Sequence, residues 1–320
     1  MIDTASLNAN ELVSKLKSGD ISSVDLCKAY IKRIEKFEKD VQAWAFLDKK
    51  ILLEKAEEAD EYRKSGKPLG ALHGLPVAIK DIIGTYDMPT ECGTVFRKKM
   101  SSSQDSEIVN LLKTAGAIIM GKTVTCELAY IHPSKTKNPH DYSRTPGGSS
   151  GGSAAALASG MTPLELGSDI GGSIRIPSHF CGLFGHKPSY NIISEVGHMP
   201  PPPGAISTGN GLSVGGPLAR CPEDLELALN VLVAPQVQDN HAWNIKLPET
   251  RTENMKDLRV AVWPDEPYAE VDEEISNLIK STAEDLKSAG ATEETAKLPF
   301  TFAEIDKLYS GLLNPLMLAG

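Results

Sequence analysis

The stretch that decides the fold runs from Gly147 to Ser173 and reads GGSSGGSAAALASGMTPLELGSDIGGS. Its 27 residues include eight glycines and six serines. Each glycine inside a regular helix or strand lowers folding stability by roughly 0.5 to 1 kcal/mol relative to alanine. The glycines of this stretch must therefore serve a purpose other than regular secondary structure. Glycine permits a positive φ and a close backbone approach, which lets several N–H groups point at one spot. The stretch therefore predicts two glycine-shaped turns that carry the hydroxyls of Ser149 and Ser173.

Other interpretations of a glycine- and serine-rich stretch fit less well. A flexible linker would lack core residues, whereas the apolar runs 154–158 and 161–166 lie inside this one. A phosphate-binding P-loop needs Gly-Lys-Ser or Gly-Lys-Thr after the glycines, and neither follows. The Gly-x-Ser-x-Gly elbow of an α/β-hydrolase does not occur around Ser173. The pattern therefore favours a different kind of serine site.

Three separate segments resemble the amidase signature family. They are GGSSGGS at 147–153, GSDIGGSIRIP at 167–177 and, upstream, HGLPVAIKD at 73–81. They agree in residue type, order and spacing with the two serine motifs and the lysine segment of that family. The likeness covers the chain from about residue 8 to its end. It implies the family's α/β fold, a central mixed β-sheet covered on both faces by helices.

The resemblance also implies a Ser-Ser-Lys relay. Ser173 matches the nucleophile, Ser149 the bridging serine and Lys80 the base, and the family needs no metal or organic cofactor. The family holds its bridging serine after a cis peptide bond, which implies a cis bond between Gly148 and Ser149. The positions that match the backbone N–H groups of the oxyanion hole are Ile170, Gly171, Gly172 and Ser173. The positions that match supporting residues are Gly148, Ser150, Asp169 and Arg175, and the last two are expected to form an ion pair.

The surroundings of Lys80 favour a role as base independently of the resemblance. Residues 75–83 form a short apolar run between glycines, which is typical of a strand buried on both faces. Lys80 lies near the carboxyl end of this run, where open α/β sheets present catalytic groups. Burial penalises the charged amine and lowers its pKa. The alternative is a structural lysine whose amine reaches solvent or pairs with Asp81.

Other nucleophile and base combinations are less well supported. A Ser-His-Asp triad could use Asp169, four residues before Ser173, but no histidine stands in a recognisable triad motif; the histidines are at positions 73, 132, 140, 179, 186, 198 and 241. Cys181 follows Phe180 in an apolar context, which predicts a buried, inert thiol.

The flanking sequence alternates between helical and strand patterns, as α/β proteins do. Asn8 or Asn10 and Ser22 or Ser23 are candidate N-caps for the first two helices, and Asp105 or Ser106 for a later one. The predicted helices span 11–18, 24–37, 49–64, 105–113, 153–159, 221–234, 272–288 and 302–313. Further strands are predicted at 117–120 and 258–263. We expect a single domain over 1–320, with a helical part at about 8–66, a core at about 70–235 and an incomplete strand–helix part at about 256–320. The run 200–203 is expected to form a stiff rim.

Composition narrows the function classes. The net charge of −9 and pI of about 5.4 argue against unaided binding to nucleic acid or an anionic membrane. Five scattered cysteines without Cys-x-x-Cys spacing indicate reduced thiols rather than disulfides or a zinc site. No signal peptide and no run of eighteen apolar residues is visible. The sequence therefore predicts a soluble, cytoplasmic enzyme that binds neither nucleic acid nor membrane.

The predicted activity is hydrolysis of a small-molecule carboxylic amide through an acyl-enzyme on Ser173, and an ester or carbamate would suit the same machinery. One alternative is the amidotransferase subunit that acts with partner chains on charged tRNA. That subunit usually reads DTGGSIRQP where this chain reads DIGGSIRIP, so Ile170 and Ile176 argue against it. Another alternative is a truncated, inactive homologue, because family members continue beyond the point where this chain stops. An exposed edge near residue 320 would be covered by a second copy in a homo-oligomer.

Overall fold

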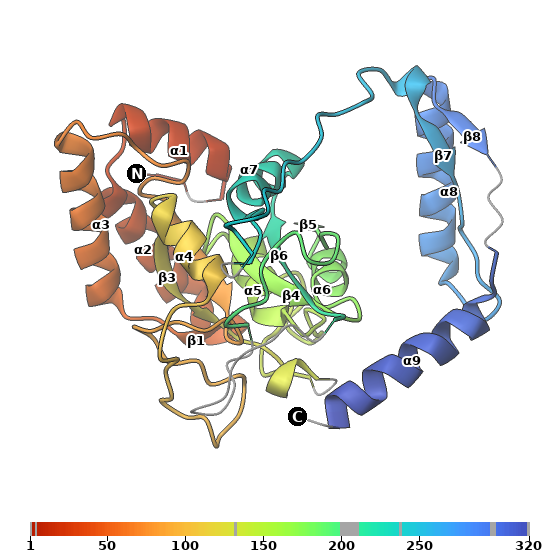
Figure 1. Ribbon diagram of the computed structural model, residues 1–320, viewed down its shortest axis with the longest axis horizontal. Coiled ribbons are helices and arrows are strands. Elements are labelled where there is room, and N and C mark those ends of the chain that lie inside the picture. Colours follow the sequence, from red (N-terminus) through yellow and green to blue (C-terminus); the bar gives the residue numbers. More distant parts are fainter. Residues whose placement is uncertain are drawn as a thin grey trace. The chain divides into compact units, whose positions relative to one another are not determined.

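The computed structural model describes residues 2–3, 5–130, 133–198, 211–236, 239–294 and 299–318 (Figure 1). The chain divides into two compact units, Met1–Lys246 and Leu247–Gly320, where the sequence predicted one domain. The predicted rim at 200–203 lies outside the described residues. Within the described ranges, every helix is too short or too polar to cross a membrane.

The first unit is built on a mixed sheet of six strands in the order β1-β3-β2-β4-β6-β5. The central strands β3, β2 and β4 run parallel, and the outer pairings are antiparallel. This arrangement confirms the predicted α/β class with a central mixed sheet. The strands are β1 (Trp44–Phe46), β2 (Pro76–Lys80), β3 (Ile118–Thr123), β4 (Glu165–Asp169), β5 (Phe184–Gly185) and β6 (Val214–Ala219).

The N-terminal helices are α1 (Ala9–Ser18), α2 (Ser23–Val41) and α3 (Lys49–Lys64), drawn in red to orange in Figure 1; α2 packs against α3, and α1 contacts α7 (Pro222–Leu232). Asn8, rather than Asn10, caps α1 in a capping box with Glu11, and Gly19 ends the helix with a φ of +84°. Ser22 caps α2. These local caps explain why the helix starts could be predicted to within two residues.

Buried carboxylates from distant helices cap α1 and α2 a second time. Asp60 in α3 accepts the Ser23 N–H at 2.8 Å. Asp224 in α7 (Pro222–Leu232) accepts the N–H groups of Ala9 at 2.8 Å and Asn10 at 2.9 Å. A helix N-terminus leaves N–H groups unpaired and carries a partial positive charge, so each aspartate stabilises a helix start and ties two helices together.

The strands that carry the chemistry are buried along their whole length. Every residue of β2, β3, β4 and β6 is buried, as expected for strands covered on both faces. The remaining helices described in this unit are α4 (Glu107–Thr114), capped by Ser106, α5 (Gly151–Ala158), α6 (Arg175–Phe180) and the short 3-10 helix η1 (Glu127–Ala129). Helices α5 and α6 begin next to the two serine turns, which lie at the ends of the buried strands.

The second unit contains a two-stranded parallel sheet and two longer helices. Strand β7 (Arg259–Ala261) pairs with β8 (Thr292–Glu294), and the Arg259 guanidinium holds the Glu294 carboxylate through bonds of 2.8 and 2.7 Å. The helices are α8 (Glu273–Ser288) and α9 (Phe302–Leu318). The predictions of a strand at 258–263 and helices at 272–288 and 302–313 are confirmed within a few residues.

Candidate active site

Lys80 ends strand β2 and is fully buried. Its Nζ donates to Ser149 Oγ at 2.7 Å and to Ser168 Oγ at 3.0 Å. Burial lowers the pKa of the amine from its ordinary 10.5 to about 7, although the nearby Cys126 and Asp169 act in the opposite direction. The amine can therefore be neutral near pH 7, which is what a proton acceptor needs.

Ser149 lies on a turn whose backbone is unusual. The Gly148–Ser149 peptide bond is cis, as the resemblance implied, and Gly147 has a φ of +79°. The Ser149 carbonyl accepts the N–H of Cys126 at 3.3 Å, and the side chain is only 3% exposed. The turn holds the Ser149 hydroxyl inside the protein, against Lys80.

Ser173 lies in the connection between β4 and α6 and is half-buried, whereas Lys80 and Ser149 are buried. The Ser150 N–H donates to the Ser173 carbonyl at 3.2 Å, so the two glycine-rich turns lie against each other. Ser173 is therefore the more accessible of the two turn hydroxyls. A nucleophile must be accessible to the substrate, whereas a lysine base is more easily neutral when it is buried away from water.

Asp169 organises the turn before Ser173. Its carboxylate accepts the N–H groups of Gly172 at 2.8 Å and Ile174 at 3.0 Å, and it pairs with Arg175 through bonds of 2.9 and 3.1 Å. Burial alone would raise its pKa, but the hydrogen bonds from Arg175 and the backbone outweigh burial and lower the pKa below the ordinary 3.8. The predicted ion pair of Asp169 and Arg175 is confirmed.

The same carboxylate changes the expected oxyanion hole. The prediction used four backbone donors, but the Gly172 N–H is bound to Asp169. Among the described residues, no acceptor contacts the N–H of Gly171 or Ser173, and Gly171 is exposed. The Gly172 N–H therefore has a charged partner in this geometry, which leaves it less available to an oxyanion, and the assignment of the four donors stays a prediction. The φ of +112° at Gly172 explains why the position is glycine.

The chain has relatives among known proteins. The sequence profile described as Amidase matches residues 25–314. The chain belongs to the amidase signature family. Among solved structures, a fatty acid amide hydrolase superposes on 97% of this chain and 56% of its own length, with a TM-score of 0.87 and 28% identity. A peptide amidase from Stenotrophomonas maltophilia covers 92% of this chain and 63% of its own, with a TM-score of 0.77 and 26% identity.

Curated relatives of this amidase-family chain carry a more specific name. A glutamyl-tRNA(Gln) amidotransferase subunit of Carboxydothermus hydrogenoformans is 36% identical over 92% of this chain and 61% of its own length. The same subunit of Natranaerobius thermophilus is 34% identical over 95% of this chain and 62% of its own. The chain thus spans about 61% of the length of these relatives.

These relatives overturn the expected partners. The sequence predicted a small-molecule substrate and no nucleic acid, from the net charge of −9 and the resemblance. The relatives are named as subunits of an amidotransferase of glutamyl-tRNA(Gln), which contradicts that prediction. The net charge was a poor guide because a subunit can contact RNA as part of a complex. The charge of one subunit therefore does not exclude RNA as a partner of the complex.

Cys181 and Ser168 are two further residues near Lys80 and the serine turns. Cys181 is 1% exposed and burial raises its pKa to about 12, so the predicted burial of this thiol is confirmed and its inertness stays a prediction. Ser168, by contrast, had no predicted role, although it bonds Lys80 as directly as Ser149 does. The signal in the sequence was its place five residues before Ser173, but only the packing of strand β4 against β2 brings its hydroxyl to Lys80. Ser150 is fully buried, with its Oγ 3.4 Å from the Ser168 carbonyl.

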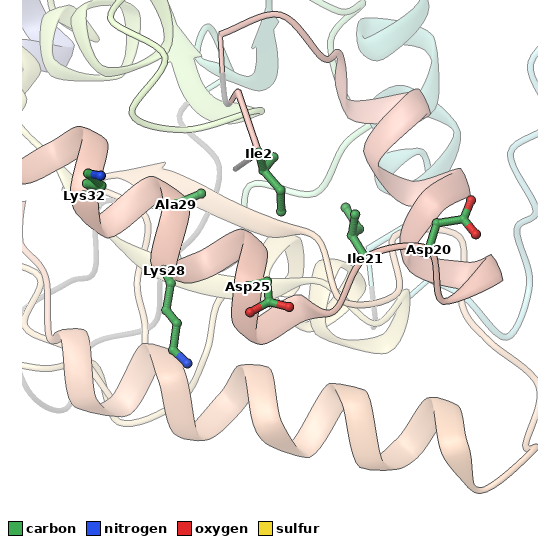
Figure 2. A pocket seen from close by; sticks show the side chains of 7 residues that line it. All are labelled: Ile2, Asp20, Ile21, Asp25, Lys28, Ala29 and Lys32. Atoms are coloured by element: carbon green, nitrogen blue, oxygen red, sulfur yellow. The ribbon is translucent and has the colours of Figure 1, made fainter.

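Hollows lie on the surface of the first unit where the structure describes it. One of about 440 Å³ is lined by Asn138, Arg144, Thr145 and Phe180. It adjoins the bridging turn, because Thr145 Oγ1 accepts the Gly147 N–H at 3.2 Å. Figure 2 shows another, of about 570 Å³, which contains no predicted site residue and mixes both signs of charge; it is lined by Ile2, Asp20, Ile21, Asp25, Lys28, Ala29 and Lys32.

Proposed function

We propose that this chain cleaves a carboxylic amide C–N bond through an acyl-enzyme on Ser173, with Ser149 and Lys80 as the proton relay. The observation that carries the proposal is the buried Lys80 amine 2.7 Å from Ser149 Oγ. Because burial lowers its pKa to about 7, a substantial fraction of the amine is neutral at neutral pH. A serine hydroxyl needs such a base within reach to become a nucleophile.

The first step forms the new bond. Neutral Lys80 takes the hydroxyl proton of Ser149 as Ser149 takes that of Ser173, and Ser173 Oγ attacks the carbonyl carbon. The substrate carbonyl oxygen becomes negative and accepts hydrogen bonds from the backbone N–H groups of Gly171 and Ser173. Loss of one such donor typically costs on the order of 3 kcal/mol in the transition state.

The second step breaks the C–N bond. An amide anion is a poor leaving group, so the nitrogen must be protonated as it departs. The Lys80 ammonium returns the proton through Ser149 to that nitrogen. The released amine or ammonia leaves an ester of Ser173, which water cleaves with the same relay acting as base. The whole cycle of attack, C–N cleavage and ester hydrolysis consumes one water and regenerates neutral Lys80.

The chemistry is tested with two substitutions and a matched control. Ser173→Ala is expected to abolish amine release from a panel of aryl and alkyl amides, and Lys80→Met to reduce it by about 10² to 10⁴. Lys122→Met also removes a fully buried lysine, but its Nζ bonds Thr90 at 2.8 Å rather than a serine of the relay. That control is expected to stay within a few-fold of wild type. Unchanged turnover in a folded Lys80→Met variant would remove the relay.

For the biological setting, we propose a subunit that supplies ammonia from an amide to partner chains acting on charged tRNA. The support is the identity of 34 to 36% with subunits of glutamyl-tRNA(Gln) amidotransferases over more than 90% of this chain. The relay described above suits this role, because releasing ammonia from a carboxamide is the same C–N cleavage.

A free-standing amide hydrolase is the second candidate, and one contact favours it. The Ile176 side chain lies over the turn before Ser173, since a Cβ at Gly172 would be 2.6 Å from Ile176 Cδ1. The amidotransferase subunit usually has glutamine at this position, so the residue that differs touches the reacting turn. An apolar contact there suits an apolar acyl group better than a polar one.

The two settings differ in what activates the enzyme. Ammonia release from glutamine and amidation of glutamyl-tRNA(Gln) are measured with and without the other subunits of an amidotransferase. Activity that depends on those subunits and on charged tRNA supports the amidotransferase. Rapid hydrolysis of alkyl or aryl amides by the chain alone, with no glutamine turnover in either condition, identifies the free-standing hydrolase.

A further inference from the structure

Lys80 has a second hydroxyl partner that the relay does not use. Its Nζ lies 3.0 Å from Ser168 Oγ, beside the 2.7 Å contact with Ser149 Oγ. All three side chains are buried, with exposed fractions of 0% for Lys80, 3% for Ser149 and 4% for Ser168. Water is therefore a poor substitute for either hydroxyl, and the two serines define the directions in which the amine can bond.

The neutral amine has two N–H groups and one lone pair. It can take the proton of Ser149 only when the lone pair, and not an N–H, points at Ser149 Oγ. The N–H groups must then find acceptors elsewhere, because a buried donor without a partner is costly. Ser168 Oγ is an acceptor in the required place, so bonding to Ser168 favours the rotation of the amine that makes it a base.

Ser168 is well suited to fix the orientation of the Lys80 amine. It lies inside β4, where its register partner is Gly215 of the antiparallel strand β6. Its backbone also lies against Ser150 Oγ, 3.5 Å from the N–H and 3.4 Å from the carbonyl oxygen. Ser149, by contrast, lies on a turn. A residue fixed in a buried strand keeps its hydroxyl in place while the turn hydroxyl exchanges protons.

We infer that Ser168 is a positioning residue, which accepts an N–H of Lys80 and so aims the amine's lone pair at Ser149. The inference rests on the proposed function, because it assigns no chemistry to Ser168 itself. No proton passes through Ser168, which keeps its own hydrogen throughout the cycle.

The charged groups around Lys80 determine how the loss of the Ser168 hydroxyl should change a pH profile. Asp169 at the end of β4 is the ionised neighbour, and the thiols of Cys92 and Cys126 are neutral because burial raises their pKa values. The Ser168 oxygen also stabilises the ammonium form. Removing the Ser168 oxygen leaves Asp169, Cys92 and Cys126 unchanged but takes one hydrogen-bond partner from the ammonium. The pKa of Lys80 should therefore fall further.

The test measures how fast a fluorophosphonate labels Ser173 as a function of pH, which requires no knowledge of the substrate. Ser168→Ala is expected to label about tenfold more slowly at its optimum. Its acid limb is expected at lower pH than in wild type, by about half a unit. Ser168→Cys keeps the volume but is a weaker acceptor, and it is expected to shift in the same directions. Ser159→Ala is the control, since that buried hydroxyl has no partner among the described residues.

The outcomes separate this inference from the proposed function. A merely structural Ser168 would lower the melting temperature and the labelled fraction but leave the acid limb in place, and that result overturns the inference. Wild-type labelling rates in folded Ser168→Ala and Ser168→Cys also overturn it. If Lys80→Met labels as fast as wild type, the relay itself fails, whatever the Ser168 variants do.

Discussion

Two fully buried lysines on neighbouring strands show how partners decide what an amine can do. Lys122 donates to the Ile83 carbonyl and to Thr90 Oγ1, and it lies near the carboxylate of Asp81. A carbonyl only accepts, so Lys122 satisfies it best with a proton in place. Lys80 meets hydroxyls, which accept and also donate. Its neutral form therefore keeps its hydrogen bonds, which is the requirement for a base.

At this scale the first prediction concerns pH. The pKa of Lys80 is lowered to about 7 by burial, and in the proposed relay the amine acts only without its proton. As pH falls through 7 the amine becomes charged, so kcat/KM for an amide should fall about tenfold per pH unit on the acid side. A profile between pH 5.5 and 9 measures this. The residual activity of Lys80→Met should not fall in this way on the acid side of the profile. An acid-side fall that survives in that variant would belong to another titrating group.

Helix α5 starts in direct contact with the sheet. Its second residue, Gly152, has no room for a side chain, because a Cβ there would lie 2.3 Å from the Val124 backbone nitrogen. The Gly152 N–H also donates to the Val124 carbonyl at 3.0 Å. This contact brings the turn that carries Ser149 against the end of β3, so one glycine joins helix, strand and site.

The second prediction compares two helical glycines. Gly152→Ala should destabilise the protein by about 1 to 3 kcal/mol, because backbone atoms must move to admit the methyl group. Gly311→Ala in α9 meets nothing within 4 Å and should be neutral or stabilising by up to about 1 kcal/mol. Urea unfolding followed by circular dichroism measures both. Equal effects of the two substitutions would contradict the packing described for α5.

The third prediction concerns the link between α7 and α1. Asp224→Ala removes the acceptor of the Ala9 and Asn10 N–H groups and should cost about 1 to 3 kcal/mol of unfolding free energy. Glu226→Ala changes an exposed acidic residue on the same helix and should stay within about 0.5 kcal/mol of wild type. The two are compared by urea midpoint at neutral pH. A smaller loss for Asp224→Ala than for Glu226→Ala would refute the capping role.

At the scale of the whole molecule, the proposed relay belongs to one of the two units. Lys80, Ser149, Ser168 and Ser173 all lie in Met1–Lys246, together with the six-stranded sheet. The segment 239–254 between the units contains no helix or strand and is mostly exposed. Exposed backbone of this kind is where proteases cut first.

The fourth prediction follows from this division. Brief digestion with trypsin should cut first at Lys246 or Arg251, both in the irregular segment. The fragment that ends there contains the whole relay and should still be labelled by a fluorophosphonate at Ser173. Mass spectrometry identifies the cut and the label. First cleavage inside the six-stranded unit, or loss of labelling on cleavage, would show that the units are not independent in this respect.

Local patterns in the sequence were a good guide to single elements. The helix 49–64 and the caps at Asn8, Ser22 and Ser106 depend on residues a few positions apart, so they could be predicted. The bounds of strand β4 could not, because its glycine, serine and aspartate resemble a turn and are fixed as a strand by pairing with β6. The second caps from Asp60 and Asp224 also escaped, since they join residues far apart in the chain.

The sequence by itself indicated the family, because the glycine and serine motifs are local. Through that resemblance it also indicated the cis turn and the three residues of the proposed relay. Tertiary structure alone decided that Ser168 bonds Lys80 and that Asp169 occupies the Gly172 N–H. Both contacts depend on how strands and turns meet in space. The direction of a buried hydrogen bond follows from packing and strand register, which no short stretch of sequence contains.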